Sequence, residues 1–297
     1  MCWKGTFGGV ECGQVAADVK IAFSASGQPV LGLIAGSGRL PFALARAARD
    51  AGIRIAAVGH VGETDPALEA EVDSMEWVRL GQLRRISRTL RAAGAGSAVL
   101  VGGLKKASYF DGARPDLSAL KLLATLPRRG DDRLLRAIAD WFGSQGLEIV
   151  APGELLRGCF APAGPIAGPA ATRRELEDAA EGLRVARLLG TADVGQTVVV
   201  REGAIVAVEA MEGTDACIRR AGLLAPGVVV VKAQKPGQDL RFDLPAIGPC
   251  TIAVLAEARG RLLAVEAGST VLLDAGELRA EAARLGISVV GLAGGEG

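Results

Sequence analysis

Short apolar runs alternate with amphipathic segments in the first half of the chain, and this alternation constrains the fold more than any other feature. VLGLIAG (30–36) and IRIAAVG (53–59) are typical of buried strands, and RLPFALARAARDAG (39–52) between them is typical of a helix. The order continues with GQLRRISRTLRAAGAG (81–96) as a helix and AVLVGG (98–103) as a strand. Repeated strand–helix–strand units predict an α/β fold with a parallel sheet.

The chain has 297 residues, a length that favours about two domains. We expect a first domain over 29–156 and a second over 172–297. The segment 157–171 between them, RGCFAPAGPIAGPAA, is rich in proline, glycine and alanine and has no period, so it is the expected linker. Residues 1–28 precede the first convincing strand and are expected to be a disordered leader or a cloning remnant.

The second half mixes helices and strands. Thr172 and Glu175 form the pattern of a capping box, which predicts the start of a helix. QTVVVREGAIVAVE (196–209) is typical of a hairpin that turns at Glu202 and Gly203. Helices and short strands follow in alternation, so we predict a mixed α/β domain with both antiparallel and crossover connections.

The composition excludes several classes of function. The formal net charge is +1 and the basic residues are spread along the helices, so the chain lacks the basic surface that duplex nucleic acid requires. The single histidine, His60, leaves hardly any room for a Ser-His-Asp triad, and the five cysteines include no C-x-x-C pair of the kind that binds zinc. A catalytic metal in this chain should therefore be held by oxygen.

A glycine-rich turn follows the first strand. GLIAGSGRLP (32–41) places Gly36, Ser37 and Gly38 between a strand end and a helix start, where backbone N–H groups and the helix dipole attract phosphate. The G-x-G-x-x-P pattern departs from the dinucleotide fingerprint, and the region about twenty residues further on offers His60 in place of an acid for the ribose. A phosphate or nucleotide ligand and a plain tight turn are both open readings.

Two more strand ends carry charged side chains. VGGLKK brings Lys105 to the same rim as the glycine turn, where it could neutralise an anion. VEAMEGTDACI (208–218) ends a strand with Glu209 and Glu212 and then starts a helix with Thr214 and Asp215. An N-cap role and the helix dipole account for Thr214 and Asp215, but not for Glu212. The acidic side chains of this corner could hold a divalent cation directly or through water.

The segment KPGQDLRFDLPAIG (235–248) concentrates charge beside an apolar run. Apolar and charged residues alternate in it from Asp239 onward, which predicts a strand with one buried and one polar face. In a straight strand Asp239 and Asp243 would lie about 13 Å apart, too far to share one metal ion. A solvated edge strand, whose charges discourage aggregation, is the alternative.

The two aspartates should therefore have different roles. Asp239, beside Lys235 and Gln238, is the better candidate for catalysis, and Asp243 the better candidate for orienting Arg241. Carboxylates, together with water and substrate phosphates, suit Mg²⁺ or Mn²⁺, which polarise phosphoryl oxygens. Phosphate-ester or pyrophosphate chemistry follows as the hypothesis.

Taken together, LGLIAGSGRLP, VGGLKK, EAMEGTDACIRRAG and KPGQDLRFDLPAIG make the chain resemble the metal-dependent UDP-2,3-diacylglucosamine pyrophosphatases of lipid A biosynthesis, the type unrelated to calcineurin-like enzymes. The likeness runs from about Val30 to Leu292. It implies a Rossmann-like amino-terminal domain and a distinct α/β carboxy-terminal domain with a cleft between them. It also implies Mg²⁺-dependent hydrolysis of UDP-2,3-diacylglucosamine to 2,3-diacylglucosamine 1-phosphate (lipid X) and UMP.

The resemblance also implies roles for individual residues. The family's essential aspartate matches Asp239, which we assign to metal binding or water activation, with Lys235 and Arg241 on the phosphate charge. Glu212 and Asp215 lie in the second acidic motif and are assigned to the metal. The residues expected to contact the substrate are Gly36, Ser37, Gly38, Lys105, Thr214 and Gln238.

Acyl chains need an apolar trough, for which CFAPAGPIAG in the linker and the helix LSALKLLATL are candidates. Such a trough would draw a cytoplasmic enzyme into transient contact with the inner membrane surface without anchoring it. Whether the chain forms a homodimer is left open by the sequence. Two other classes stay open: a nicotinamide-dependent oxidoreductase that uses the glycine turn, and a nucleotide-sugar or dinucleotide-binding protein without hydrolase activity.

Overall fold

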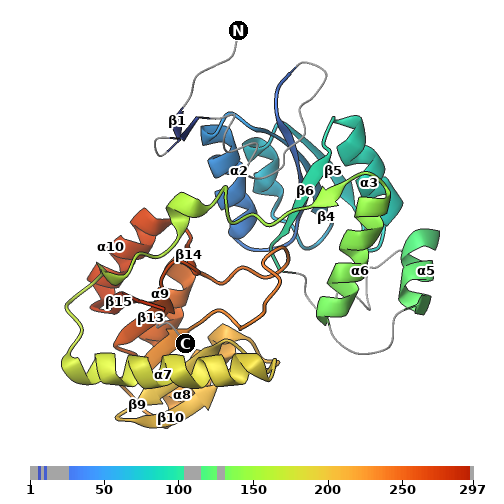
Figure 1. The fold of residues 1–297 in the computed structure, drawn as a ribbon. Helices are drawn as coiled ribbons and strands as arrows, with labels where there is room; N and C mark the ends of the chain where they lie inside the picture. Colours follow the sequence, from blue (N-terminus) through green and yellow to red (C-terminus); the bar gives the residue numbers. More distant parts are fainter. Residues whose placement is uncertain (1–5, 8–9, 12–26, 104–114, 126–130, 295–297) are drawn as a thin grey trace. The chain divides into compact units, whose positions relative to one another are not determined.

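The computed structural model describes residues 6–7, 10–11, 27–103, 115–125 and 131–294. They form two compact units (Figure 1). Unit 1 comprises Met1–Gly158 and, in addition, the short segment Asp239–Asp243. Unit 2 comprises Cys159–Gln238 and Leu244–Gly297. The chain therefore leaves unit 2 and returns to it within a few residues.

Unit 1 is built on a five-stranded sheet with the order β5-β4-β3-β6-β7, and every pair of neighbouring strands is parallel. Its strands are β3 (Val30–Ala35), β4 (Arg54–His60), β5 (Ser74–Val78), β6 (Ser97–Val101) and β7 (Glu148–Ile149). Its helices are α2 (Leu40–Asp50), η1 (Pro66–Glu71), α3 (Leu83–Ala92), α5 (Leu117–Thr125) and α6 (Asp131–Ser144). The expected Rossmann-like parallel sheet is confirmed.

The strand order fixes where unit 1 can bind a ligand. The chain builds outward from β3 through β4 to β5, then returns to place β6 on the other side of β3. The direction of winding thus reverses between β3 and β6, and in open parallel sheets ligands bind outside the carboxyl ends of the strands at such a point. One core of unit 1 joins these strands to α3, α5 and α6, through side chains such as Ile34, Ile86 and Phe142.

Unit 2 holds a six-stranded mixed sheet with the order β10-β9-β11-β13-β15-β8. Its strands are β8 (Gly164–Ala167), β9 (Thr197–Arg201), β10 (Ala204–Val208), β11 (Val229–Lys232), β13 (Leu262–Glu266) and β15 (Ser288–Leu292). A separate pair consists of β12 (Ala246–Ile247) and β14 (Val271–Leu272). The helices are α7 (Arg173–Thr191), α8 (Thr214–Leu224), α9 (Pro249–Glu257) and α10 (Ala275–Leu285), and η2 (Arg157–Cys159) precedes them. The expected mixed α/β domain is confirmed.

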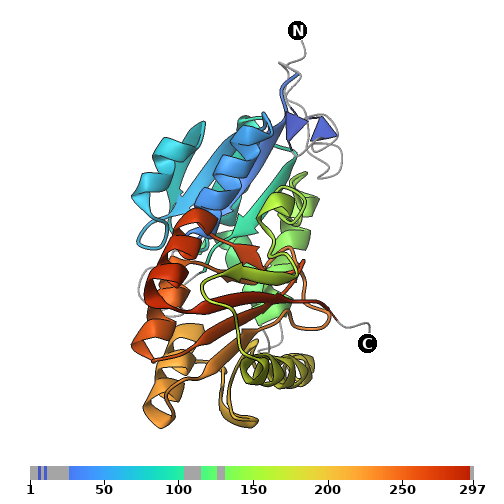
Figure 2. The ribbon, with the colours of Figure 1, turned by 90° about the vertical axis from the view of Figure 1, so that its left-hand side faces the viewer.

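The unit 2 sheet is buried on both faces. Alternate side chains of its central strands point to opposite sides: Val198 and Val231 pack with α7, whereas Val199 and Val230 pack with α8, α9 and α10. Figure 2 shows α7 on one side of these strands and α10 on the other. Because helices cover both faces of the sheet, the sequences of these strands are continuous valine runs rather than alternating polar and apolar residues.

Local sequence signals in unit 2 are confirmed. Thr172 and Glu175 form the complete capping box at the start of α7. Glu202 and Gly203 both have positive φ and turn the β9–β10 hairpin, with Ala204 opposite Arg201. Within the expected linker 157–171, however, β8 pairs with β15 and so belongs to the sheet.

Most of the expected leader 1–28 lies outside the described residues. Of its described part, β1 (Thr6–Phe7) and β2 (Val10–Glu11) pair antiparallel. Among the described helices, none combines the length and the apolar character that crossing a membrane requires.

Candidate functional site

The strand expected from the alternation at 239–244 is wrong, because residues 240–242 form a turn and the charged segment is extended in a strand at β12 instead. The backbone N–H of Phe242 donates to Asp239 O at 3.0 Å, and that of Asp243 lies 3.3 Å from the same oxygen. The carboxylate of Asp239 also accepts the backbone N–H of Arg241 at 3.2 Å. A side chain that binds its own backbone two residues on competes with a strand ladder, which explains the difference. Asp239 and Asp243 are thus one turn apart rather than 13 Å along a strand.

Asp239 sits between two guanidinium groups. Arg241 donates to it twice, from Nε to Oδ1 at 3.0 Å and from Nη2 to Oδ2 at 2.8 Å. Arg136 of α6 places its Nε 3.5 Å from Oδ2. Hydrogen bonds from Arg241, more than any other cause, hold the pKa of Asp239 below its usual value. The carboxylate is therefore ionised. Its hydrogen bonds also orient Arg241, the residue that Asp243 was expected to orient.

An aromatic side chain anchors this cluster in unit 1. Phe242 packs against the core that contains Phe142, and the guanidinium of Arg241 lies 4.9 Å from the Phe242 ring centroid. Arg136 was missed by sequence reasoning, because nothing in its helical surroundings distinguishes it from the other arginines. The segment and α6 become neighbours only through tertiary structure.

Lys235 and Gln238 lie in unit 2, whereas Asp239 and Arg241 belong to unit 1. The Nζ of Lys235 donates to Asp193 Oδ1 at 2.8 Å, and its backbone N–H donates to Gln238 Oε1 at 3.0 Å. The Nε2 atom of Gln238 is buried and makes no hydrogen bond within the part of the chain that the structure describes. A buried donor without a partner is unusual and suits a contact with a ligand.

Thr214 is not the N-cap of α8, contrary to expectation. Gly213, with φ of 84°, takes that position, and the Thr214 hydroxyl instead donates to Glu209 Oε1 at 3.1 Å. Glu209 is only 8% exposed, and its second oxygen, Oε2, is buried without a hydrogen-bond partner among the described residues. Sequence reasoning counted Glu209 among the three acids of this corner that could hold a divalent cation, but it assigned no individual role to this residue.

The other two acids of this corner differ from Glu209. Glu212 bonds Arg220 Nη2 through Oε1 at 2.6 Å and the backbone N–H of Ala210 through Oε2 at 3.0 Å. Hydrogen bonds from its own backbone and from Arg220 lower its pKa. Asp215 is exposed in the first turn of α8. The described residues contain no group of three or more His, Cys, Asp or Glu side chains that could hold a metal ion.

The backbone of the glycine turn is largely occupied. Gly36 N–H donates to Val101 O at 2.8 Å, and Ser37 N–H donates to Gly103 O at 2.7 Å. A Cβ at Gly36 would lie 2.5 Å from Gly103 O, so glycine is needed where this turn contacts the backbone of Gly102 and Gly103. Two of the amides expected to cradle phosphate are thus used within the protein. Gly38, with φ of 91°, has nothing within 4 Å of where its Cβ would be. Lys105 lies outside the described residues.

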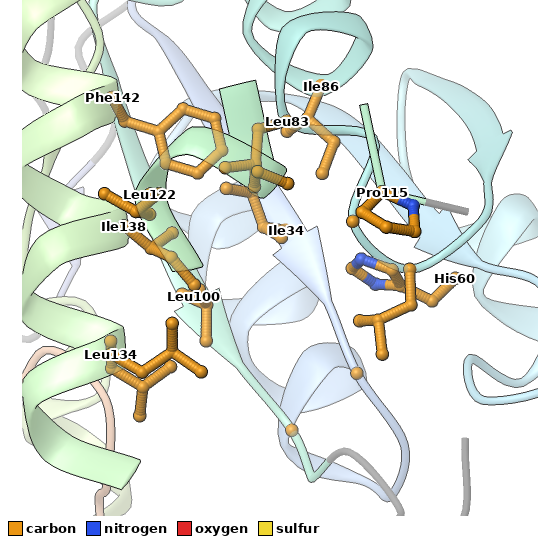
Figure 3. Close-up of a pocket in the computed structure, with 16 residues that line it drawn as sticks. Ile34, His60, Leu83, Ile86, Leu100, Pro115, Leu122, Leu134, Ile138 and Phe142 are labelled. Carbon is orange, nitrogen blue, oxygen red and sulfur yellow. The ribbon is translucent and has the colours of Figure 1, made fainter. Parts of the chain in front are cut away.

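An apolar cavity of about 310 Å³ lies in unit 1, beside the carboxyl ends of β3 and β6. Figure 3 shows His60 and Pro115 on one side of it and Leu134, Ile138 and Phe142 of α6 on the other. Ala119 and Leu122, from the helix that sequence reasoning proposed as acyl-chain trough, also line it. The other proposed trough, in the former linker, does not contribute. The described lining residues are Ile34, Gly36, His60, Leu80, Gly81, Leu83, Ile86, Leu100, Gly102, Pro115, Ala119, Leu122, Leu134, Leu135, Ile138 and Phe142.

His60 is buried at the end of β4, and burial lowers its pKa despite opposing effects of Ala35 O and the nearby Glu63. The unfolded chain, with a pKa near 6.5, therefore takes up this proton before the folded chain does. We expect folding stability to be full above pH 6.5 and to be lost progressively as the pH falls from 6.5 toward the lower, folded-state pKa. Urea unfolding of the wild type and of His60→Asn from pH 7.5 to 5 measures this.

Because His60 is the single histidine, the difference between the two curves isolates its titration. Both proteins carry the same carboxylates. If the free energies of unfolding of the wild type and of His60→Asn changed equally with pH between 6.5 and 5, the lowered pKa of His60 would be contradicted.

Comparisons with known proteins agree with this two-part architecture. The family model for the LpxI N-terminal domain matches residues 30–159, and the model for the LpxI C-terminal domain matches residues 162–290. The UDP-2,3-diacylglucosamine pyrophosphatase LpxI of Caulobacter vibrioides is 36% identical over 274 residues, which cover 88% of this chain and 97% of that relative.

Proposed function

Because the chain belongs to the LpxI family, we propose that it hydrolyses the pyrophosphate bond of UDP-2,3-diacylglucosamine in lipid A biosynthesis, releasing 2,3-diacylglucosamine 1-phosphate (lipid X) and UMP, with Mg²⁺ as cofactor. The observation that carries this proposal is the cluster of Asp239 with Arg136 and Arg241. It combines an ionised carboxylate with two groups suited to phosphate.

The guanidinium groups of the cluster suit a diphosphate. Arg136 and Arg241 flank the carboxylate of Asp239, and the charges of Asp140 and Glu148 also act on Arg241. Guanidinium is planar and always charged, and it binds phosphate oxygens through paired N–H donors. Lys235 is proposed to add charge from unit 2. The proposed substrate-binding residues are Gly36, Ser37, Gly38, Lys105, Thr214 and Gln238.

The hydrogen bonds of Asp239 describe a resting arrangement. A carboxylate offers about four lone-pair sites, and four N–H groups approach this one, three from Arg241 and one from Arg136. A diphosphate competes for the same guanidinium groups with a larger charge. Its arrival would draw Arg136 and Arg241 onto phosphate oxygens and release the carboxylate of Asp239 for its own role.

The low pKa of Asp239 favours one of its two expected roles. A general base works best when its pKa is near the operating pH. Arg241 lowers the pKa of Asp239 away from that range. Asp239 is therefore proposed as a ligand and orienting group rather than as the acceptor of the water proton.

The residues present fit a magnesium ion. Mg²⁺ is usually bound by one or two carboxylates together with water and substrate phosphates, so a cluster of three acids is not required. Asp239 is ionised and supplies one carboxylate, and Asp215 and Glu212 are the other proposed ligands. When bound, Mg²⁺ or Mn²⁺ would neutralise charge on the phosphoryl oxygens. We place the reaction in the cytoplasm, with transient contact at the inner membrane surface, because the substrate carries acyl chains.

Product analysis tests the function. Purified full-length protein with Mg²⁺ should release UMP from UDP-2,3-diacylglucosamine, and EDTA should reduce the rate at least about a hundredfold, because the metal stabilises transition-state charge. Mg²⁺ or Mn²⁺ added back should restore it. Hydrolysis in ¹⁸O-labelled water, followed by mass analysis, identifies the phosphorus that is attacked. Binding of the substrate without any UMP release would instead establish a nucleotide-sugar-binding protein without hydrolase activity.

A further inference from the structure

The apolar cavity of unit 1 has the size and the lining of a ligand pocket. Such pockets measure about 300–1,000 Å³ and are lined mainly by apolar side chains. This one is partly open to solvent and measures about 310 Å³. All but one of its described lining residues lack a polar side-chain atom. Its lining therefore selects an apolar ligand rather than ordered water.

The position of the cavity points to a ligand of the reaction. Ile34 of β3 and Leu100 of β6 both line it, so it occupies the place where the winding of the sheet reverses. Rossmann-like proteins bind nucleotides there, with free turn amides and an acid for the ribose. Here the amides of Gly36 and Ser37 are bonded within the protein, and no acid lines the cavity among the described residues. The cavity thus occupies the position where Rossmann-like proteins bind nucleotides, but its lining is apolar.

Helix α6 serves both the cavity and the charged cluster. Leu134, Ile138 and Phe142 follow one another at four-residue spacing and line the cavity (Figure 3). Arg136, between the first two, pairs with Asp239. Since successive helical residues turn by about 100°, Arg136 projects from a different face of α6 than the side chains that line the cavity. One helix thus carries the wall of the cavity and a member of the charged cluster on different faces.

His60 gives the cavity a single polar feature. Its Nδ1 lies 2.9 Å from Ala35 O, and since a carbonyl only accepts, Nδ1 carries the proton. Thr64 fixes this arrangement, because its hydroxyl donates to the same oxygen at 2.6 Å and accepts the His60 backbone N–H at 2.8 Å. The lowered pKa keeps the ring neutral. Nε2 is then a hydrogen-bond acceptor in an otherwise apolar lining.

We propose that the cavity binds one acyl chain of the substrate and that His60 Nε2 accepts a hydrogen bond from a donor on the bound acyl group. This inference rests on the proposed function and adds a position for the lipid part of the substrate. In 2,3-diacylglucosamine the 2-acyl group is attached through nitrogen, so its linkage has an N–H donor. The 3-acyl group is attached through oxygen, so a donor on that side must be a hydroxyl on the chain. The two sources share one chemistry, an N–H or O–H donor next to an alkyl chain.

Binding of two simple amphiphiles tests the cavity without turnover. Decan-1-ol and 1-methoxynonane have the same atoms, but only the alcohol has a donor. Calorimetric titration of the full-length protein should show binding of both, with the alcohol about three- to tenfold tighter, the effect of one net hydrogen bond. In His60→Asn the amide can still donate to Ala35 O, but nothing replaces Nε2. That variant should bind both compounds equally.

A bulky substitution tests the location. Ile138→Trp fills the cavity and should weaken both amphiphiles at least tenfold, whereas Arg133→Trp, at an exposed position of α6, should not change their affinity. Ala119→Phe serves the same purpose if Ile138→Trp does not fold. Failure of both amphiphiles to bind, or unchanged binding after the cavity is filled, overturns the acyl site. Equal affinities in the wild type overturn the role of His60.

These outcomes are independent of hydrolysis. If the amphiphiles bind as expected but no UMP is released, the proposed function fails and the cavity remains an alkyl-chain site. If hydrolysis occurs, Ile138→Trp should raise KM for the diacylated substrate about tenfold or more and leave kcat nearly unchanged. Substrates acylated only at nitrogen or only at oxygen identify the chain: the one whose KM responds to both Ile138→Trp and His60→Asn occupies the cavity. A KM that responds to neither variant contradicts the proposal.

Discussion

Asp239→Asn should lower kcat for UDP-2,3-diacylglucosamine by about a thousandfold or more, the size expected when a group that organises transition-state charge is lost. Asparagine keeps the size of the side chain but removes its charge. Arg136 and Arg241 would also lose their ionic partner and become available to phosphate oxygens. We therefore expect the variant to bind substrate at least as tightly as the wild type, measured by calorimetry alongside single-turnover kinetics.

Asp243→Asn is the matched control. Asp243 is exposed and lies one turn from Asp239 in the same segment. Its replacement should change kcat by less than about tenfold, because no transition-state charge is assigned to it. An equal loss in both variants would mean that the segment acts as a whole rather than through Asp239. Wild-type melting temperatures in both variants would show that the effect on kcat is not a folding defect.

Gly102→Ala should be the most destabilising small substitution at the rim of the cavity. Gly102 has φ of 95°, and an added Cβ would lie 2.6 Å from Ser37 O and 2.9 Å from Gly36 C. The backbone conformation alone costs about 1–2 kcal/mol in an L-residue, and the clash with backbone atoms adds to it. With about 2–4 °C lost per kcal/mol, we expect a melting temperature about 10 °C lower.

Gly38→Ala separates the two contributions. Gly38 has nearly the same φ, 91°, but nothing lies within 4 Å of an added Cβ. Its substitution should cost the conformational part alone, about 3–6 °C in melting temperature. If Gly102→Ala and Gly38→Ala have the same melting temperature, the backbone around Gly102 accommodates an added Cβ with less strain than the distances indicate.

The strands and turns that the sequence predicted are those decided by local chemistry. The buried strands of unit 1 and the hairpin at Glu202 and Gly203 follow from apolar runs and from residues with positive φ. β5 was missed because it is an edge strand of mixed polarity, SMEWV, with only Val78 buried. The strand expected at 239–244 fails for a different reason: its alternating pattern is genuine, but the Asp239 carboxylate binds the local backbone instead.

The candidate site was predicted in part. The sequence singled out Asp239 and Arg241 but assigned the orienting role to Asp243, because both aspartates lie two residues from Arg241 and a strand would place all three side chains on one face. Arg136 reaches the carboxylate from a helix about a hundred positions earlier in the chain, and no spacing rule covers such a distance. The cavity could not be predicted either, because its lining comes from strands, loops and three helices that only the folded sheet brings together.

The five residues Asp239–Asp243 have a consequence for how such a protein can be divided. The boundary between the two family domains, near residue 160, would leave this segment with the carboxy-terminal piece, although the core on which Phe242 packs and the partner Arg136 belong to the other one. A fragment ending there would lack the Phe242 ring from its core and the carboxylate from beside Arg136. Recombination at the apparent border would therefore separate partners that must be inherited together, so neither half is a transferable module.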